Sequence, residues 1–426
     1  MEKYSFDIDY GIISDIARGR EIVSFGEATH RVTELHRFAC ELFKYLVTKE
    51  GFRVMIFESA WALYEQMQGF FAGEYASLEE YNSEIELYFN AFYSEPTKEL
   101  MFWIRDYNRS HPDDPIIVAG YQPEQPVTDS RAIKELCAAN GFAIPEDIET
   151  VLNEQPFYSG EHRTDLEALS CYGRRMRSGE RLMEPELRER TVEALKSLSA
   201  LVEDARESFS VRDFGLLNAH LTSLTFYVDG LNYYAEKAAL LSPGSYRYSR
   251  ESSDLGVLMY TRGDAARFKI FNYLRESVFP GRKIYIWQHI WHAFKYSYEL
   301  GDIDCAALPG RGAVSFGTNT QSMYGEKYAL IGSILAKADD SDRGSIDYAF
   351  KQACPPEALV DLSRVQGLPI HDPRGRLYET ENDIYFENVD LAKQCDGIFY
   401  TRDFSFTYGT VSYTHLRAHE TRHDLV

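Results

Sequence analysis

Residues 22–30 read Ile-Val-Ser-Phe-Gly-Glu-Ala-Thr-His, and this stretch decides the fold that the sequence predicts. Its apolar start is typical of a short buried strand and its glycine of a turn, and residues 31–49 are typical of an amphipathic helix. Such a strand carries a carboxylate, Glu27, and an imidazole, His30, to its carboxyl end. Open α/β sheets bind ligands at that edge. We therefore expect an α/β protein with a ligand site beside this stretch.

Three further strand-like runs also end in polar residues. Residues 53–57 lead to Glu58, residues 116–120 to Tyr121 and Gln122, and residues 283–287 to Gln288, His289 and His292. The carboxyl ends of parallel strands meet at one edge of a sheet. We therefore expect one site made of carboxylates and imidazoles, formed by Glu27, His30, Glu58, His289 and His292.

The sequence pattern changes twice along the chain. Strand and helix patterns alternate up to residue 124, whereas residues 128–240 are rich in Leu, Ala, Glu and Arg and show no convincing strand. Strand patterns return at 283–287, 328–331 and 397–400. Short, nearly all-apolar strands are typical of parallel sheets. We predict a discontinuous α/β catalytic domain from residues 1–124 and 256–410, with a mostly parallel sheet and flanking helices. Residues 125–255 are predicted to be a helical insertion at the rim of the cleft.

The last stretch, residues 411–426, differs from the rest. It holds three of the 11 histidines of an otherwise acidic chain. We interpret it as a non-native, disordered tail that resembles adapter read-through, exclude it from the site, and expect it to be dispensable.

Composition limits the class of protein. With 426 residues and 44% hydrophobic content, the chain can bury one large core or two modest ones. A formal charge of −21 argues against a nucleic-acid or anionic-membrane partner. No apolar run reaches the roughly 18 residues of a membrane span, and the start of the chain is too polar for a secretory signal. The six cysteines are scattered without a C-x-x-C pair, which favours a reducing compartment. We expect a soluble, cytoplasmic enzyme or binding protein.

Several motifs resemble the erythromycin esterase family when taken together. They are Gly-Glu-Ala-Thr-His at 26–30, Phe-Glu at 57–58, and Trp-x-His-x-x-His at 287–292, with further matches at 100–108, 317–328 and 396–399. The resemblance runs from about Ile12 to Phe404. It implies a hydrolase that opens a macrocyclic lactone, such as a macrolide, or cleaves a related carboxylic ester. With a macrolide as substrate, the outcome would be antibiotic inactivation.

The resemblance also implies roles for the strand-end residues. A histidine held by a carboxylate can activate water, because the carboxylate fixes the tautomer and stabilises the imidazolium. That role falls to His30, with Glu27 and Glu58 as polar neighbours. We assign His289 and His292 to polarisation of the oxyanion and protonation of the leaving alcohol. Each residue also has a structural alternative, such as a helix cap or a satisfied histidine on an aromatic face. His36, in the following helix, is interpreted as a surface histidine.

The periphery departs from the family pattern. Arg31 stands where glycine is common after His30, Ala39 stands at a basic position of the first helix, and Ala265 and Ala266 stand at an Arg-Asp pair. Neighbouring residues would have to substitute. The predicted substrate-binding residues are Arg37, Trp103, Tyr121, Gln122, Arg262 and Arg267.

Other functions stay open. Neither G-x-S-x-G nor a nucleotide-binding glycine motif is present, so serine nucleophiles and nucleotides are unsupported. We predict no cofactor and no metal, although the two carboxylates and three histidines are competent ligands for a divalent ion. The alternatives are a metal-dependent hydrolase, an enzyme of polysaccharide or secondary-metabolite biosynthesis on the same scaffold, and a non-catalytic binding protein. The oligomeric state cannot be derived from the sequence.

Overall fold

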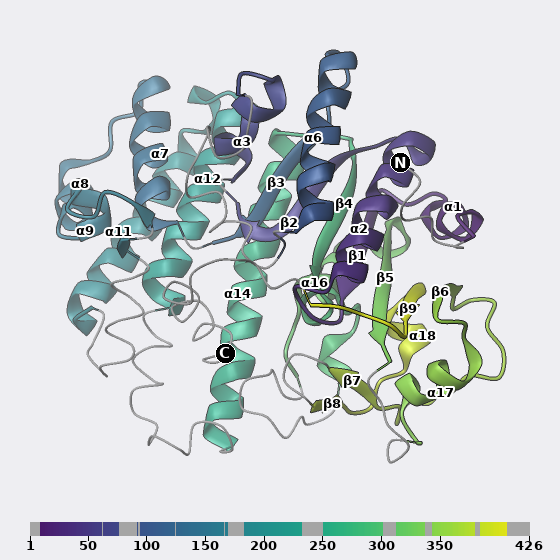
Figure 1. Ribbon diagram of the computed structural model, residues 1–426. Helices are drawn as coiled ribbons and strands as arrows, with labels where there is room; N and C mark the ends of the chain where they lie inside the picture. The colour runs from purple at the N-terminus through teal and green to yellow at the C-terminus, as the bar shows by residue number, and fades with distance from the viewer. Residues whose placement is uncertain are drawn as a thin grey trace.

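A computed structural model describes most of the chain (Figure 1). The described residues are 9–61, 63–75, 92, 94–123, 125–165, 167–168, 183–231, 250–300, 312–336, 343–379 and 384–406. The predicted tail at 411–426 lies outside them.

A seven-stranded sheet forms the centre of the molecule, in the order β3-β2-β4-β1-β5-β9-β6. All neighbouring strands are parallel except β6, which runs antiparallel to β9. The bounds of these strands are β1 (Ile22–Glu27), β2 (Phe52–Ala60), β3 (Ile117–Gln122), β4 (Lys283–His289), β5 (Tyr328–Leu335), β6 (Glu357–Asp361) and β9 (Gly397–Thr401). A separate two-stranded sheet joins β7 (Leu377–Glu379) to β8 (Ile384–Phe386). The predicted α/β fold with a mostly parallel sheet is confirmed.

Every run predicted as a strand is a strand of this sheet. The sequence did not reveal β6, because it is a short edge strand that begins with Glu357 and ends with Asp361. Three of its five residues are only partly buried and both of its ends are acidic, so it lacks the continuous apolar run by which the central strands were identified.

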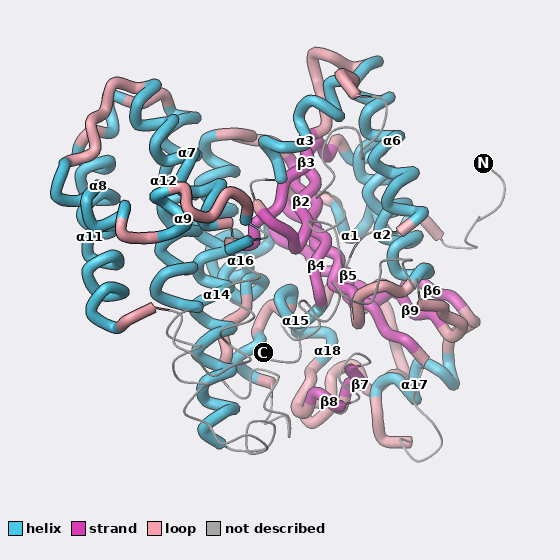
Figure 2. The backbone as a smooth tube through the Cα atoms, turned by 60° about the vertical axis from the view of Figure 1, so that its left-hand side comes forward, coloured by secondary structure: helices cyan, strands magenta, loops and turns pink. Residues whose placement is uncertain are grey.

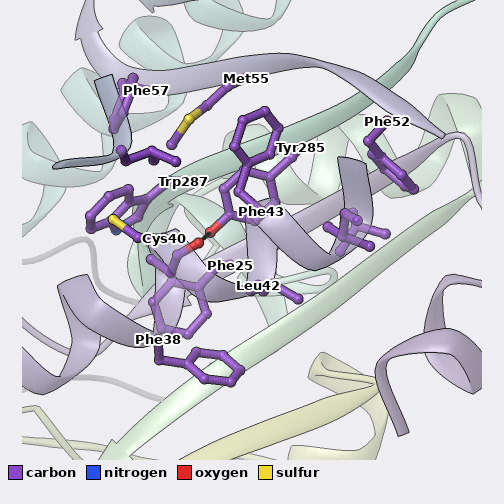
Figure 3. Packing of buried hydrophobic residues seen from close by; sticks show 14 of the residues in the cluster. Phe25, Phe38, Cys40, Leu42, Phe43, Phe52, Met55, Phe57, Tyr285 and Trp287 are labelled. Carbon is purple, nitrogen blue, oxygen red and sulfur yellow. Dashed lines mark hydrogen bonds between the residues drawn. The ribbon is translucent and has the colours of Figure 1, made fainter. Parts of the chain in front are cut away.

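One face of the sheet is covered by helices from the first quarter of the chain. They are α1 (Gly11–Ala17), α2 (Thr33–Tyr45) with its π-helical continuation η1 (Leu46–Glu50), α3 (Leu63–Ala72) and α6 (Glu95–Ser110). Figure 3 shows aromatic side chains of α2, such as Phe38 and Phe43, packed against Phe25, Tyr285 and Trp287 of the strands. The phenol of Tyr285 also donates a hydrogen bond to a carbonyl of α2, at 3.1 Å. Alternate residues of β1 and β4 thus fix α2 against the sheet.

The other strand residues point into a second apolar cluster on the opposite face. Its helices are α12 (Val211–Thr225), α14 (Arg250–Ser277), α15 (Ile290–Ala293), α16 (Phe316–Tyr324), α17 (Ile346–Ala353) and α18 (Leu391–Gln394). Short 3-10 turns lie between elements at η2 (Arg206–Ser208), η4 (Ser297–Glu299) and η5 (Gly325–Lys327).

The described part of residues 125–255 is helical and has an apolar core of its own. Besides α12 it contains α7 (Pro126–Ala139), α8 (Glu146–Asn153), α9 (Pro156–Ser159), α11 (Pro185–Asp204) and the π-helical η3 (Phe226–Leu231). These helices gather on one side of the sheet (Figure 2). The predicted boundary at 255/256 falls inside α14, so one continuous helix belongs to both parts. The division into two domains remains a prediction.

A buried acid ties these helices to the sheet. Asp129 of α7 accepts hydrogen bonds from Trp61, just after β2, at 3.2 Å and from His220 of α12 at 2.9 Å. The hydroxyl of Ser223 donates to its other oxygen. Burial raises the pKa of Asp129 well above its usual value. His220, which has no evident partner in the sequence, is therefore part of a polar network between α7, α12 and the end of β2.

Two further expectations concern spans and cysteines. No helix within the described ranges is long and apolar enough to cross a membrane. Cys40, Cys137, Cys354 and Cys395 are free thiols.

The residue after His30 has an unusual backbone conformation. Arg31 has φ of 62°, in the left-handed region that a side chain with a Cβ adopts at a cost. Glycine, which the resemblance led us to expect at this position, would adopt this conformation without that cost. The turn that presents His30 is therefore strained in this chain.

Replacing Arg31 by glycine is expected to raise the free energy of unfolding by about 0.5–1 kcal/mol. The left-handed penalty of about 1–2 kcal/mol disappears, and the greater backbone entropy of glycine in the unfolded chain offsets only part of it. Urea denaturation measures the difference. As a control, Lys196→Gly in the exposed middle of α11 should lower the stability by about 1 kcal/mol. Equal losses in both variants would show that Arg31 is unstrained.

Candidate active site

Glu27 and His30 form a hydrogen-bonded pair at the carboxyl end of β1. The His30 Nδ1 and Glu27 Oε1 atoms are 2.5 Å apart. The other carboxylate oxygen accepts a hydrogen bond from the indole nitrogen of Trp287 at 2.8 Å. Because Nδ1 faces the carboxylate, Nε2 of His30 points away from Glu27.

The environment of Glu27 brings the pKa of its carboxyl group close to neutral pH. Burial of the fully enclosed carboxylate raises its pKa to about 7, against the lowering effect of the hydrogen bonds from His30 and Trp287. A carboxylate that titrates near neutral pH next to an imidazole is a common feature of catalytic sites.

His289 lies beside this pair at the end of the neighbouring strand. The parallel register of β1 and β4 places it opposite Glu27, and its ring centroid is 5.1 Å from that of His30. Its Nδ1 accepts the backbone N–H of Trp291 at 3.3 Å. A neutral His289 therefore carries its proton on Nε2 and can donate it to an oxygen of a ligand.

A glycine allows the turn after β4 to approach β1. A Cβ at Gly26 would lie 3.1 Å from the Cα of Ile290, tighter than most real contacts of a Cβ atom. The absence of a side chain there lets α15 pack on the end of β1, which brings His292 to the same edge.

Glu58 organises the second half of the site. One of its oxygens accepts the backbone N–H of His289 at 2.7 Å. The other lies 3.2 Å from Nε2 of His292 and 3.4 Å from the donating amide of Gln122. This carboxylate therefore joins β2 and β3 to the turn that carries both histidines of β4 and α15.

His292 lies between two carboxylates. Its Nε2 faces Glu58, and its Nδ1 is 2.8 Å from an oxygen of Asp264 on α14. Arg267, one turn further along α14, donates to Asp264 at 2.6 Å and contacts the ring of His292 at 3.1 Å. Tyr260 stacks on the same ring with a centroid distance of 5.4 Å. The result is a buried cluster of alternating charges.

The charges of this cluster reinforce one another. Burial alone would lower the pKa of His292, but the carboxylates of Asp264 and Glu58 raise it. Burial alone would likewise raise the pKa of Glu58, yet the charge and hydrogen bond of His292, with His30 and Arg267, hold it well below its usual value. These shifts favour an imidazolium at His292 beside an ionised Glu58. Glu27 and Glu58 therefore have pKa values moved in opposite directions.

The structure brings together the five residues predicted from the strand ends. All five are buried, and His30, His289 and His292 keep 6–7% of their surface exposed. Of the predicted substrate-binding residues, Arg267 and Gln122 contact this group directly. Tyr121 lies beneath it, where its hydroxyl donates to Gln288 at 2.7 Å.

Three other predicted substrate-binding residues lie elsewhere. Arg37 binds Glu357 of the edge strand β6 at 2.7 Å. Trp103 lies on α6, packed against Tyr107 and the apolar core. Arg262 lines a cavity of about 380 Å³ between α11, η3 and α14, near Asp229. These contacts are with elements other than the strand ends that carry the histidines.

Sequence reasoning missed two residues of the site and misplaced another. Asp264 and Tyr260 were not selected, although their spacing of four residues, with Arg267 three further on, puts all three on one helix face. His36 was interpreted as a surface histidine, and this is wrong: its side chain is fully buried, 3.7 Å from Glu27. Phe92 covers His30, with ring centroids 5.3 Å apart.

The described residues do not form a preformed metal site. No three His, Cys, Asp or Glu side chains among them converge as metal ligands would. In the cluster around His292, both ring nitrogens face carboxylates, so neither is directed at a shared central position.

Comparisons with known proteins agree with the fold. The family model of erythromycin esterase matches residues 47–404. No curated protein matches the chain. Three solved structures are similar to it, at identities for which the likeness establishes the fold alone.

The first is a Bacillus cereus protein, with 18% identity and a TM-score of 0.67 over 95% of this chain and 93% of that one. The second is a succinoglycan biosynthesis protein, with 16% identity and a TM-score of 0.66 over the same shares. The third is a mutant of the erythromycin esterase EreC in an open conformation, with 14% identity and a TM-score of 0.68 over 95% and 96%.

Replacing Asp264 by asparagine is expected to lower the free energy of unfolding by about 3 kcal/mol or more, because it leaves a buried charge without its partner. The raised pKa of His292 contributes stability below about pH 6.5, and this contribution is lost as the pH rises through the folded-state pKa. The deficit should therefore be larger near pH 6 than near pH 9, as measured by urea denaturation.

A surface ion pair provides the control for this variant. Glu387→Gln breaks the exposed pair with Arg376 and should change the stability by less than about 0.5 kcal/mol at either pH. A deficit for Asp264→Asn that grows toward alkaline pH would contradict the charged state assigned to His292.

Proposed function

Since the chain belongs to the erythromycin esterase family, a family of ester hydrolases, we propose that it opens a macrocyclic lactone or cleaves a related carboxylic ester with a water activated by His30. The observation that carries this proposal is the 2.5 Å contact between Nδ1 of His30 and Glu27, which fixes the orientation of the imidazole and supports it as a base. Hydrolysis of an ester requires a base for water, a donor for the oxyanion and a proton for the leaving alkoxide.

His30 provides the first and the last of these. Its Nε2 takes a proton from water as the oxygen attacks the ester carbonyl. Glu27 stabilises the imidazolium that forms and keeps the ring in place through Nδ1. The same Nε2 then returns the proton to the leaving alkoxide, so that the products are a carboxylic acid and an alcohol.

His289 provides the donor for the oxyanion. The hydrogen bond from the backbone of Trp291 leaves its proton on Nε2, and the ring is adjacent to that of His30. One carbonyl group between the two rings could thus meet both the base and the donor. A donor already in position stabilises the oxyanion without reorganisation during the reaction.

His292 and Glu58 support this arrangement. Protonation of the alcohol by His292 would require a ring nitrogen directed at the substrate, but both nitrogens face carboxylates. We therefore assign His292 to anchoring Glu58, which in turn holds the backbone of His289. The engagement of these nitrogens also supports a mechanism without a metal ion. Free cysteines favour the cytoplasm as the place of action.

The family match supports an ester or lactone as the substrate class. If macrolides are substrates, ring opening would inactivate the antibiotic, and the product would gain the mass of one water. Incubation of the purified protein with macrolides of different ring sizes, followed by mass spectrometry, tests this. Turnover of none of them, with hydrolysis of simpler esters retained, would restrict the proposal to a different carboxylic ester. No observation favours the biosynthetic alternative.

Replacing His30 by asparagine is expected to lower kcat/KM by about 10²–10⁴-fold, because the base is lost. The melting temperature should stay nearly unchanged, since asparagine can still donate to Glu27. The matched control is His371→Asn at an exposed histidine, which should leave both quantities unchanged. An asparagine variant at position 30 that keeps more than about a tenth of the activity would exclude His30 as the base.

Activity is expected to survive prolonged dialysis against a strong chelator, and elemental analysis should find no stoichiometric zinc or manganese. A known metal-dependent hydrolase treated in parallel shows that the chelation is effective. Recovery of lost activity by one divalent ion would instead support the metal-dependent alternative.

A further inference from the structure

His36 is a buried histidine that the proposed reaction does not use. It lies on α2 with no exposed surface. Its ring meets Trp287 edge to face at 5.0 Å and stacks on Phe92 at 6.4 Å. Trp287 is the donor to Glu27, and Phe92 is the ring that covers His30. His36 thus shares its packing partners with the catalytic pair.

The two nitrogens of His36 have different surroundings. Nδ1 is 2.8 Å from the hydroxyl of Ser94, the residue that caps α6. Nε2 is buried with no hydrogen-bond partner in the described part of the chain, and it lies 3.7 Å from Oε2 of Glu27. The nearest acceptor for Nε2 that these contacts show is therefore the catalytic carboxylate.

The charge state of His36 decides whether its contact with Glu27 is an ion pair. Burial, with a smaller effect from His30, lowers the pKa of His36 to about 3, so the ring is neutral at any working pH. The 3.7 Å contact is therefore not an ion pair. A neutral imidazole has one N–H, and a lone pair on Nε2 would be repelled by the carboxylate.

The hydrogen bonds around Ser94 allow the favourable tautomer. Thr97 can donate to the Ser94 oxygen through its backbone N–H at 3.4 Å and its hydroxyl at 2.9 Å. The Ser94 hydroxyl is then left to donate to Nδ1 of His36. This places the proton of His36 on Nε2, toward Glu27.

We propose that His36 is a positioning residue that directs its Nε2–H at Glu27 and keeps this carboxylate ionised as the partner of His30. The inference rests on the proposed function, because it assigns His36 to the support of the Glu27–His30 pair. The separation is slightly longer than a hydrogen bond, as is common for catalytic contacts without a substrate. His36 would be the third N–H donor to Glu27, after His30 and Trp287.

Other titratable groups also face Glu27. His30, in the loop after β1, lowers the pKa of Glu27, whereas Glu58 on β2 raises it by its charge. Tyr285 on β4 is also close enough to interact with Glu27. Because burial already raises the pKa of Glu27 to about 7, a single donor changes the ionised fraction at neutral pH.

The first test is His36→Phe, which keeps an aromatic ring against Trp287 and removes the donor. Loss of the donor destabilises the ionised carboxylate, so the pair binds its proton at a higher pH. The acid limb of the kcat/KM profile should move up by about 0.5–1 pH unit, with the alkaline plateau retained. His36→Gln, whose amide can accept from Ser94 and donate to Glu27, should restore the limb at least in part.

A second pair of variants separates this role from stability. Ser94→Ala removes the donor that fixes the tautomer of His36 and should move the acid limb in the same direction. It also removes a helix cap, which costs about 1 kcal/mol. Ser345→Ala removes the buried cap of α17, far along the chain, at a similar cost and should leave the limb in place. Lower melting temperatures with an unmoved acid limb in the His36 and Ser94 variants would overturn the proposal.

A readout without turnover distinguishes failure of this inference from failure of the proposed function. NMR titration of ¹³C-labelled histidine rings follows His30, assigned with His30→Asn, in the wild type and in His36→Phe. The apparent titration midpoint of the Glu27–His30 pair should rise in the variant, whatever the substrate. An unchanged midpoint would exclude a role for His36, even if His30→Asn abolishes hydrolysis. A raised midpoint in a protein that hydrolyses no ester would retain the role and reject only the function.

Discussion

The buried carboxylate of Glu27 is the constraint on which the rest of the site depends. Enclosing an ionised carboxylate costs several kcal/mol unless its oxygens are hydrogen-bonded. One oxygen is held by His30 and the other by the indole of Trp287. The indole reaches it only because β1 and β4 are parallel and in the observed register, since a slip of one residue would turn Trp287 to the other face. The fold is thus organised to satisfy this group.

Glu58, the second carboxylate at this edge of the sheet, has its pKa moved in the opposite direction to that of Glu27. Glu58 is also buried, but the charges of His292, His30 and Arg267 hold its pKa well below its usual value. Environments that move the pKa values of two neighbouring carboxylates apart are a means of assigning them different roles. Glu27 can share a proton with its histidine, whereas Glu58 serves as a fixed negative charge that holds the turn after β4.

The sequence was most informative at the ends of strands. A short apolar run followed by a glycine or a polar residue indicates both a buried strand and the position of its carboxyl end, where the polar side chains lie. The backbone pairing of parallel strands then fixes where these points meet. Glu27, Glu58 and His289 could be grouped for this reason before any contact was known. The antiparallel β6 could not, because a short edge strand carries little of this signal.

Residues on helices were harder to assign, because successive positions on a helix point about 100° apart and the face depends on long-range packing. His36 appeared to lie on the surface only because nothing in α2 reveals that Phe92 and α6 cover that face. The expected Arg-Asp pair falls on two alanines, yet Asp264 and Arg267 supply the same groups around His292. Two residues three apart share a helix face, whereas consecutive residues diverge. A family motif at the end of a strand can therefore be assigned to this chain residue by residue. For a motif on a helix, the side chains must instead be compared by the helix face on which they lie.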